Sequence, residues 1–114
     1  MAKVLGVHEI ELGADKDPAE FERLASAVLA EAAPEGLNFR VFKADRGPRN
    51  GRYMILIEID SVEVRDRIFP IGGEDPPEVV AFLEEHPTAG ETWDRLESYV
   101  PSINVGTDYV EITG

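Results

Sequence analysis

The sequence predicts an α+β domain of element order β-α-β-β-α-β, with a four-stranded antiparallel sheet and helices on one face. The chain has 114 residues, which suits a single domain over residues 1–114. Strand-like and helix-like periodicities alternate in this order, and glycine or proline stands at most junctions. There is no cysteine, so disulfides, thiolate catalysis and cysteine-based metal sites are excluded.

The first strand and the first helix have the clearest patterns. Residues 3–12 alternate Val, Ile and Leu with polar positions, as a half-buried strand does. A helix then begins at Asp17-Pro18, because the aspartate can accept hydrogen bonds from the first turn and proline suits the first helical position. Apolar residues from Phe21 to Ala32 follow at helical spacing and form one stripe that faces a core.

Two strands and a hairpin follow. Residues 38–45 and 53–60 are rich in β-branched and aromatic residues, which favours strands. The connection between them contains Gly47-Pro48 and Asn50-Gly51. Asn-Gly favours the positive φ angles of a tight turn, so the two strands are expected to pair as a hairpin.

The second crossover is expected to consist of three short helices. The first follows Ser61, the second follows Asp75-Pro76 and ends before Pro87, and the third begins with a capping box at Thr88. Residues 107–113 predict the last strand. The split double crossover of the ferredoxin-like fold satisfies this order, with all helices on one face of the sheet.

The third predicted strand is apolar on both faces. Ile55 and Ile57 lie on one side, while Met54 and Leu56 lie on the other. A sheet that is apolar on both faces must bury both, and the helices cover one. A second copy of the chain is the economical cover for the other face. We therefore expect a homodimer with Met54 and Leu56 at its interface.

Four segments together resemble the dimeric α/β-barrel superfamily, in which two ferredoxin-like chains pack sheet to sheet into a barrel. They are VLGVHEIEL, DPAEFERL, YMILIEIDSVEVRDRIF and FLEEHPTAGETWDRLESYV. The resemblance, to a bacterial-type member, covers residues 3–112 and includes no catalytic signature. It implies the fold and the dimer. Members include cofactor-independent monooxygenases, polyketide cyclases, haem-handling proteins and proteins with no known activity, so it does not imply one function.

The charge of the chain is strongly negative, with 23 acidic and 11 basic residues and a net charge of −12. Such a surface repels phosphate backbones and anionic lipids, so neither a nucleic-acid nor a membrane partner is expected. No apolar run approaches the length of a bilayer span, and a cytoplasmic location is expected. Bases gather in residues 40–52 and acids in residues 74–97, either as solvated surface or as two sides of a subunit contact.

His8 is the first candidate site residue. It shares a strand row with Val4, Gly6 and Ile10. If this row faces the helices, His8 is a buried, hydrogen-bonded imidazole. If the row faces the barrel, His8 lines a cavity and can serve as a general base or a ligand. The apolar end of the row, just before an amphipathic helix, favours the helix side.

Glu9 and Glu58 lie on the opposite rows and could both point into the barrel. A carboxylate among Met and Leu side chains could act as an acid or a base. Alternatively, each carboxylate pairs with an arginine such as Arg40 across the dimer, which is the commoner arrangement. Trp93 begins a helical stripe, so we expect it to pack in the core or an interface rather than to stack on a ligand.

The leading interpretation of function is a homodimeric domain that binds a small hydrophobic molecule, in a cavity between sheet and helices or in the barrel. No cofactor is expected, and haem binding ranks last because His8 is expected to be buried. One alternative is a cofactor-independent monooxygenase or polyketide-type cyclase that uses His8 and Glu58. Another is a non-catalytic structural or interaction module. Nucleotide-binding, hydrolase and zinc-protease motifs are all missing from the sequence.

Overall fold

The computed structural model describes residues 2–100 and 106–112. The elements run in the order β1 (Val4–Ile10), α1 (Pro18–Ala30), β2 (Leu37–Lys43), β3 (Tyr53–Ile59), α2 (Val62–Ile68), α3 (Pro77–Glu85), α4 (Pro87–Tyr99) and β4 (Thr107–Val110). This is the predicted β-α-β-β-α-β order, with the second crossover divided into three helices.

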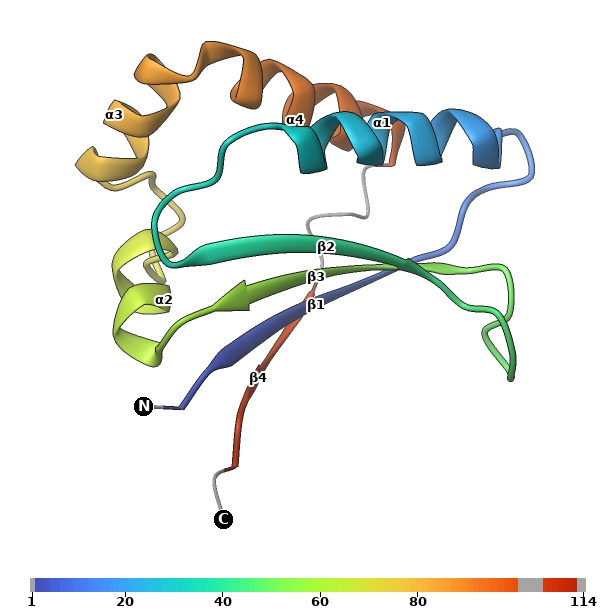
Figure 1. The fold of residues 1–114 in the computed structure, drawn as a ribbon, viewed down its shortest axis with the longest axis horizontal. Coiled ribbons are helices and arrows are strands. Elements are labelled where there is room, and N and C mark those ends of the chain that lie inside the picture. The colour runs from blue at the N-terminus through green and yellow to red at the C-terminus, as the bar shows by residue number, and fades with distance from the viewer. Residues whose placement is uncertain (1, 101–105, 113–114) are drawn as a thin grey trace.

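The four strands form one antiparallel sheet in the order β2-β3-β1-β4. The central strands β1 and β3 pair along their whole length, from Val4 opposite Ile59 to Ile10 opposite Tyr53. Figure 1 shows α1 and α4 side by side above one face of the sheet, with α2 and α3 towards the end opposite the β2–β3 hairpin. No helix of the described residues covers the other face, which we call the open face.

The core lies between the sheet and the pair α1 and α4. Along β3 every second residue is buried, and these positions alternate with half-buried ones. The buried core residues are Val4, Ile10, Phe21, Leu24, Ala25, Val28, Tyr53, Ile55, Ile57, Ile59, Leu96 and Val100. The buried residues of the strands and the apolar stripe of α1 thus pack against each other in one apolar layer, as the sequence pattern predicts.

Two of the predicted helix caps are present. The Asp17 carboxylate accepts a hydrogen bond from the Ala19 amide at 3.1 Å, and the Ser61 hydroxyl accepts one from the Val64 amide at 3.2 Å. The capping box expected at Thr88 is wrong. Helix α4 begins at Pro87, two residues earlier than a cap at Thr88 would place it. Its N-cap position is His86, which makes no side-chain cap hydrogen bond and which also ends α3.

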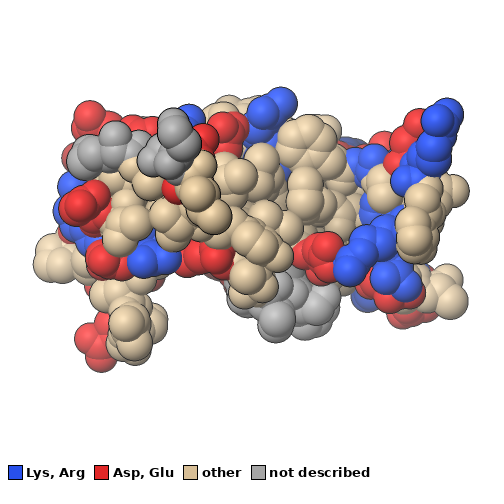
Figure 2. All heavy atoms as spheres, turned by 90° about the horizontal axis from the view of Figure 1, so that it is seen from below, with Lys and Arg blue, Asp and Glu red and all other residues tan. Residues whose placement is uncertain are grey.

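The open face is described by three rows of residues that run across the sheet from β2 to β4. The rows are Asn38–Glu58–Leu5–Tyr109, Arg40–Leu56–Val7–Thr107 and Phe42–Met54–Glu9. Their apolar members form a continuous diagonal from Phe42 to Tyr109, with charged and polar residues in the corners. Figure 2 looks onto this face and shows a largely uncharged centre, with acidic and basic side chains at both ends of the molecule and several of the basic ones at the hairpin end.

Candidate functional site

A pocket of about 700 Å³ lies between the sheet and the helices. Its floor includes His8 from β1, Phe39 from β2 and Ile57 from β3. The C-terminal end of α1, the helices α3 and α4 and the last residues of α2 surround it. Part of the helix-covered side of the sheet therefore remains unfilled, beyond the region that Phe21 and Tyr53 fill. The volume lies in the usual range for small-molecule sites.

His8 lies on the helix-facing side of β1, as the pattern of its row favours. The expectation that this side would bury the imidazole is wrong, because His8 is half-buried and lines the pocket. Gly106 stands directly against the ring: a Cβ atom at position 106 would lie 2.7 Å from it. The imidazole thus occupies space that only a glycine leaves open.

Asp108 is a second polar residue of the pocket, and it was not among the residues that the sequence pattern predicted for a site. It lies opposite Gly6 in the β1–β4 register, and a Cβ atom at Gly6 would lie 3.4 Å from the carboxylate. Arg65 of α2 pairs with the same carboxylate at 3.3 Å. The one available signal was Gly6 itself, since glycine inside a strand often marks the close approach of another group.

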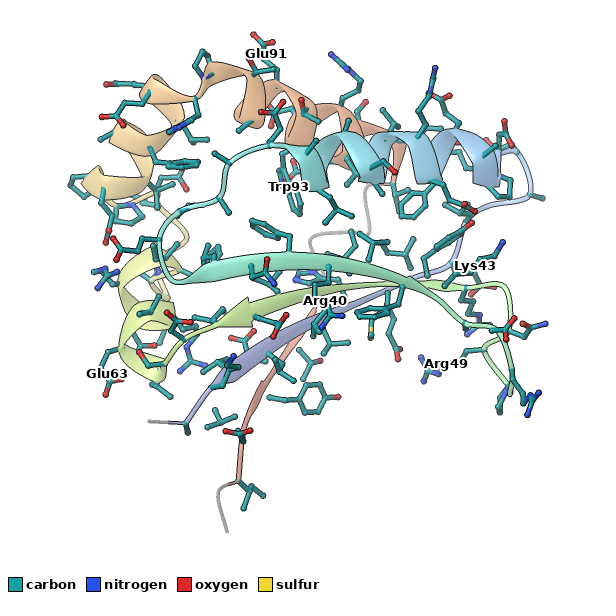
Figure 3. The ribbon with its side chains drawn as sticks, viewed as in Figure 1. Arg40, Lys43, Arg49, Glu63, Glu91 and Trp93 are labelled. Carbon is teal, nitrogen blue, oxygen red and sulfur yellow. The ribbon has the colours of Figure 1, made fainter. Side chains whose placement is uncertain are left out.

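Trp93 lines the pocket from α4 and also packs against the core. Figure 3 shows its side chain directed from α4 towards the sheet. Its ring centroid lies 5.7 Å from that of Phe39, with the planes tilted by 43°. Its indole N–H donates to a Glu97 oxygen at 2.7 Å, which holds that carboxylate beside the ring. The predicted packing role of Trp93 is confirmed by its contact with the core.

The other predicted site residues lie on the open face, away from this pocket. Arg40 and Lys3 lie 3.6 and 3.9 Å from the Glu58 carboxylate, and Asn38 donates to it at 3.1 Å. Within one chain, Glu58 therefore already has an arginine partner. His8 and Glu58 point to opposite sides of the sheet, so they cannot act together in one cavity. The suggested pair is wrong because β1 and β3 place the two residues at opposite parity.

The hairpin surrounds a smaller pocket of about 400 Å³ at the other end of the sheet. Glu9 accepts a hydrogen bond from Arg49, and Arg52 lies 3.3 Å from Glu11. These contacts join the basic segment to the end of β1 and the residue that follows it in the same chain. The contact suggested between this segment and residues 74–97 of a second chain stays a prediction.

Tyr53 is a core residue whose pKa is raised by its surroundings. Burial, together with a 2.5 Å hydrogen bond to Glu22 and the charge of that carboxylate, raises the pKa of Tyr53 to about 12. The residue lies outside the larger pocket. In the described part of the chain, no group of three or more His, Asp or Glu residues is arranged to hold a metal ion. None of the helices in that part is long and apolar enough to span a bilayer.

Comparison with known proteins supports the fold. A dimeric ferredoxin-like protein of unknown function from Thermobifida fusca superposes with a TM-score of 0.53 at 12% sequence identity. The match covers 98% of this chain and 92% of that one. No family model and no curated protein matches the sequence. The likeness identifies an α+β domain with a ferredoxin-like neighbour; at this identity it concerns the fold alone.

Proposed function

We propose that this chain is a homodimeric binding domain, in which each protomer holds a small, largely apolar molecule in the pocket between sheet and helices. The observation that carries the proposal is the pocket itself. An open pocket of about 700 Å³ in a domain of 114 residues leaves apolar side chains in contact with water, and a bound molecule would cover them. Its aromatic and aliphatic lining suits an apolar ligand.

The dimer is supported by the apolar diagonal of the open face. Leu5, Val7, Met54 and Leu56 are only half-buried in the single chain, and Phe42 is 38% exposed. A continuous apolar surface of this kind is typical of a protein–protein interface, because no helix of the described residues covers it. The Thermobifida protein of similar fold is itself described as dimeric. Two copies that join their open faces would leave both pockets on the outer sides, each beneath its own helices.

The experiment uses N-phenyl-1-naphthylamine, a neutral probe whose fluorescence rises in apolar surroundings. We expect saturable binding at one site per chain. Ala89→Phe places a ring in the pocket and should weaken binding about tenfold or more, because the probe and the new ring occupy the same volume. Ala81→Phe on the exposed surface of α3 is the matched control and should bind as the wild type does. Absence of saturable binding would leave the non-catalytic interaction module as the better description.

A cofactor-independent enzyme, such as an oxygenase or a cyclase, is the second candidate. The observation in its favour is that His8 and Asp108 line the same pocket. A histidine beside a bound phenol could accept its proton, the first step that such chemistry requires. The test is oxygen uptake with 1,4-dihydroxynaphthalene, corrected for the reaction without protein. An enzyme should accelerate it, and His8→Gln should abolish the acceleration while the neutral probe still binds.

A further inference from the structure

The charged groups that line the larger pocket are of one sign. Five carboxylates contribute to the lining: Glu31, Asp75, Asp94, Glu97 and Asp108. Among the described lining residues there is no lysine or arginine, and His8 is the one basic side chain. Residues 101–105, which precede the last strand, contain no basic residue in the sequence. The pocket therefore has a negative potential, within a chain whose net charge is −12.

Most of this charge is not neutralised by a neighbouring cation. Asp108 is the exception, because Arg65 pairs with it. Glu97 accepts its hydrogen bond from an indole. The Glu31 carboxylate lies 3.4 Å from the Thr92 hydroxyl, whose proton is donated to the Thr88 carbonyl at 2.8 Å. Both neighbours are neutral, so they leave the charge of the two carboxylates in place.

Aromatic rings stand beside the same carboxylates. Phe39 and Trp93 lie together on the wall, and Trp93 is hydrogen-bonded directly to Glu97. Phe69 and Phe82 also line the pocket. The face of an aromatic ring carries partial negative charge and attracts a cation, most strongly when the ring is that of tryptophan. Ring and carboxylate thus favour the same charge in a ligand.

We infer that the pocket selects an organic cation: a molecule with an apolar body and an amine or quaternary ammonium group. This inference rests on the proposed function and adds to it the charge of the ligand. The apolar body would fill the space between the core side chains, while the cationic group would lie at the side of Trp93 and Glu97. An inorganic cation does not fit this description, because no cluster of metal-ligating side chains is present among the described residues.

The experiment compares two ligands of similar size and opposite charge, phenyltrimethylammonium and benzenesulfonate. Each is titrated against the complex of wild-type protein with N-phenyl-1-naphthylamine, at low ionic strength. We expect the cation to displace the probe at a concentration about tenfold lower than the anion, and added salt should reduce this ratio.

The variants localise the effect. Asp94→Asn with Glu97→Gln removes two charges from the pocket and should lower the cation-to-anion ratio about threefold or more. Glu84→Gln with Glu91→Gln removes two charges outside it and should leave the ratio unchanged. Glu84 and Glu91 are exposed, and Figure 3 shows Glu91 directed away from the sheet. Binding of the neutral probe reports that each variant remains folded with its pocket intact.

The outcomes separate this inference from the proposed function. If the neutral probe binds and the two ions displace it equally, the pocket exists but the inference about charge is wrong. An equal fall of the ratio in both double variants also overturns it, because overall charge would then explain the preference. If the neutral probe does not bind the wild type, the proposed function itself fails.

Discussion

Gly106 leaves the space in which the His8 imidazole lies, since a Cβ atom at position 106 would be 2.7 Å from the ring. Gly106→Ala must therefore move the ring or the strand, at a cost of about 1–3 kcal/mol in the free energy of unfolding. We expect a changed His8 imidazole signal in the NMR spectrum and weaker binding of the naphthylamine probe. Gly72→Ala is the control, because nothing lies within 4 Å of a Cβ atom there. An unchanged His8 signal in Gly106→Ala would contradict this.

Leu56 lies at the centre of the open face, between Arg40 and Val7 in its row. In the proposed dimer, Leu56→Lys would bury a charge without a partner, which costs several kcal/mol, roughly 3–5 by analogy with broken buried pairs. Sedimentation velocity at micromolar concentration should show a dimer for the wild type and a monomer for the variant. Leu29→Lys, at a 43% exposed position on α1, should remain dimeric. A folded wild-type monomer at these concentrations would end the proposal of a dimer.

The burial of Tyr53, together with its hydrogen bond to Glu22, makes the free energy of unfolding depend on pH in the alkaline range. The pKa of Tyr53 is raised from 10.0 to about 12 in the folded chain, so folding favours the protonated phenol. Its stabilising effect is complete below pH 10 and is lost as the pH rises towards 12, by about 2–3 kcal/mol in total. Urea unfolding should show the wild type losing its advantage over Tyr53→Phe across this range. Parallel pH profiles for the two proteins would show that Tyr53 does not supply the effect.

The ion pairs of the hairpin should contribute little to stability. Arg49 pairs with Glu9 and Arg52 with Glu11, and all four side chains are at least 46% exposed. Replacing both arginines with alanine should lower the free energy of unfolding by about 0–1 kcal/mol per pair, a difference that 1 M salt would largely screen. If the replacements instead change the salt dependence of dimerisation, the basic segment contacts a second chain, as the charge distribution first suggested.

Much of the fold followed from local patterns. The alternation of Ile55, Ile57 and Ile59 and the stripe on α1 predicted both halves of the core, because each pattern has the period of its element. Element ends were less accurate: of the strand expected over 107–113, the structure has Thr107–Val110 at the edge of the sheet, followed by one backbone hydrogen bond from Glu111 to Lys3, and residue 113 lies outside the described residues. An edge strand ends where its neighbour stops pairing with it. The residues of the edge strand alone therefore do not predict where it ends.

The residues that line the pocket could not be predicted from local sequence patterns. Asp108 and Gly106 enter it through the register of β4 on β1, and Glu97 through its bond to Trp93. None of these residues has a distinctive neighbour in the chain. The cooperation of His8 with Glu58 failed because the two residues have opposite parity, and the register of β1 on β3 keeps them on opposite sides of the sheet.

The order of elements, the two apolar faces of β3 and the negative charge depend on residue type and spacing alone, so all three can be read from the printed chain. The pocket above His8, and the meeting of carboxylates and aromatic rings from separate segments between Glu31 and Asp108 around it, depend on how the helices pack on the sheet. Helices are straight and the sheet is twisted, so whether they meet in full contact depends on lengths and angles across the whole domain. Those distances arise only when all the elements pack together.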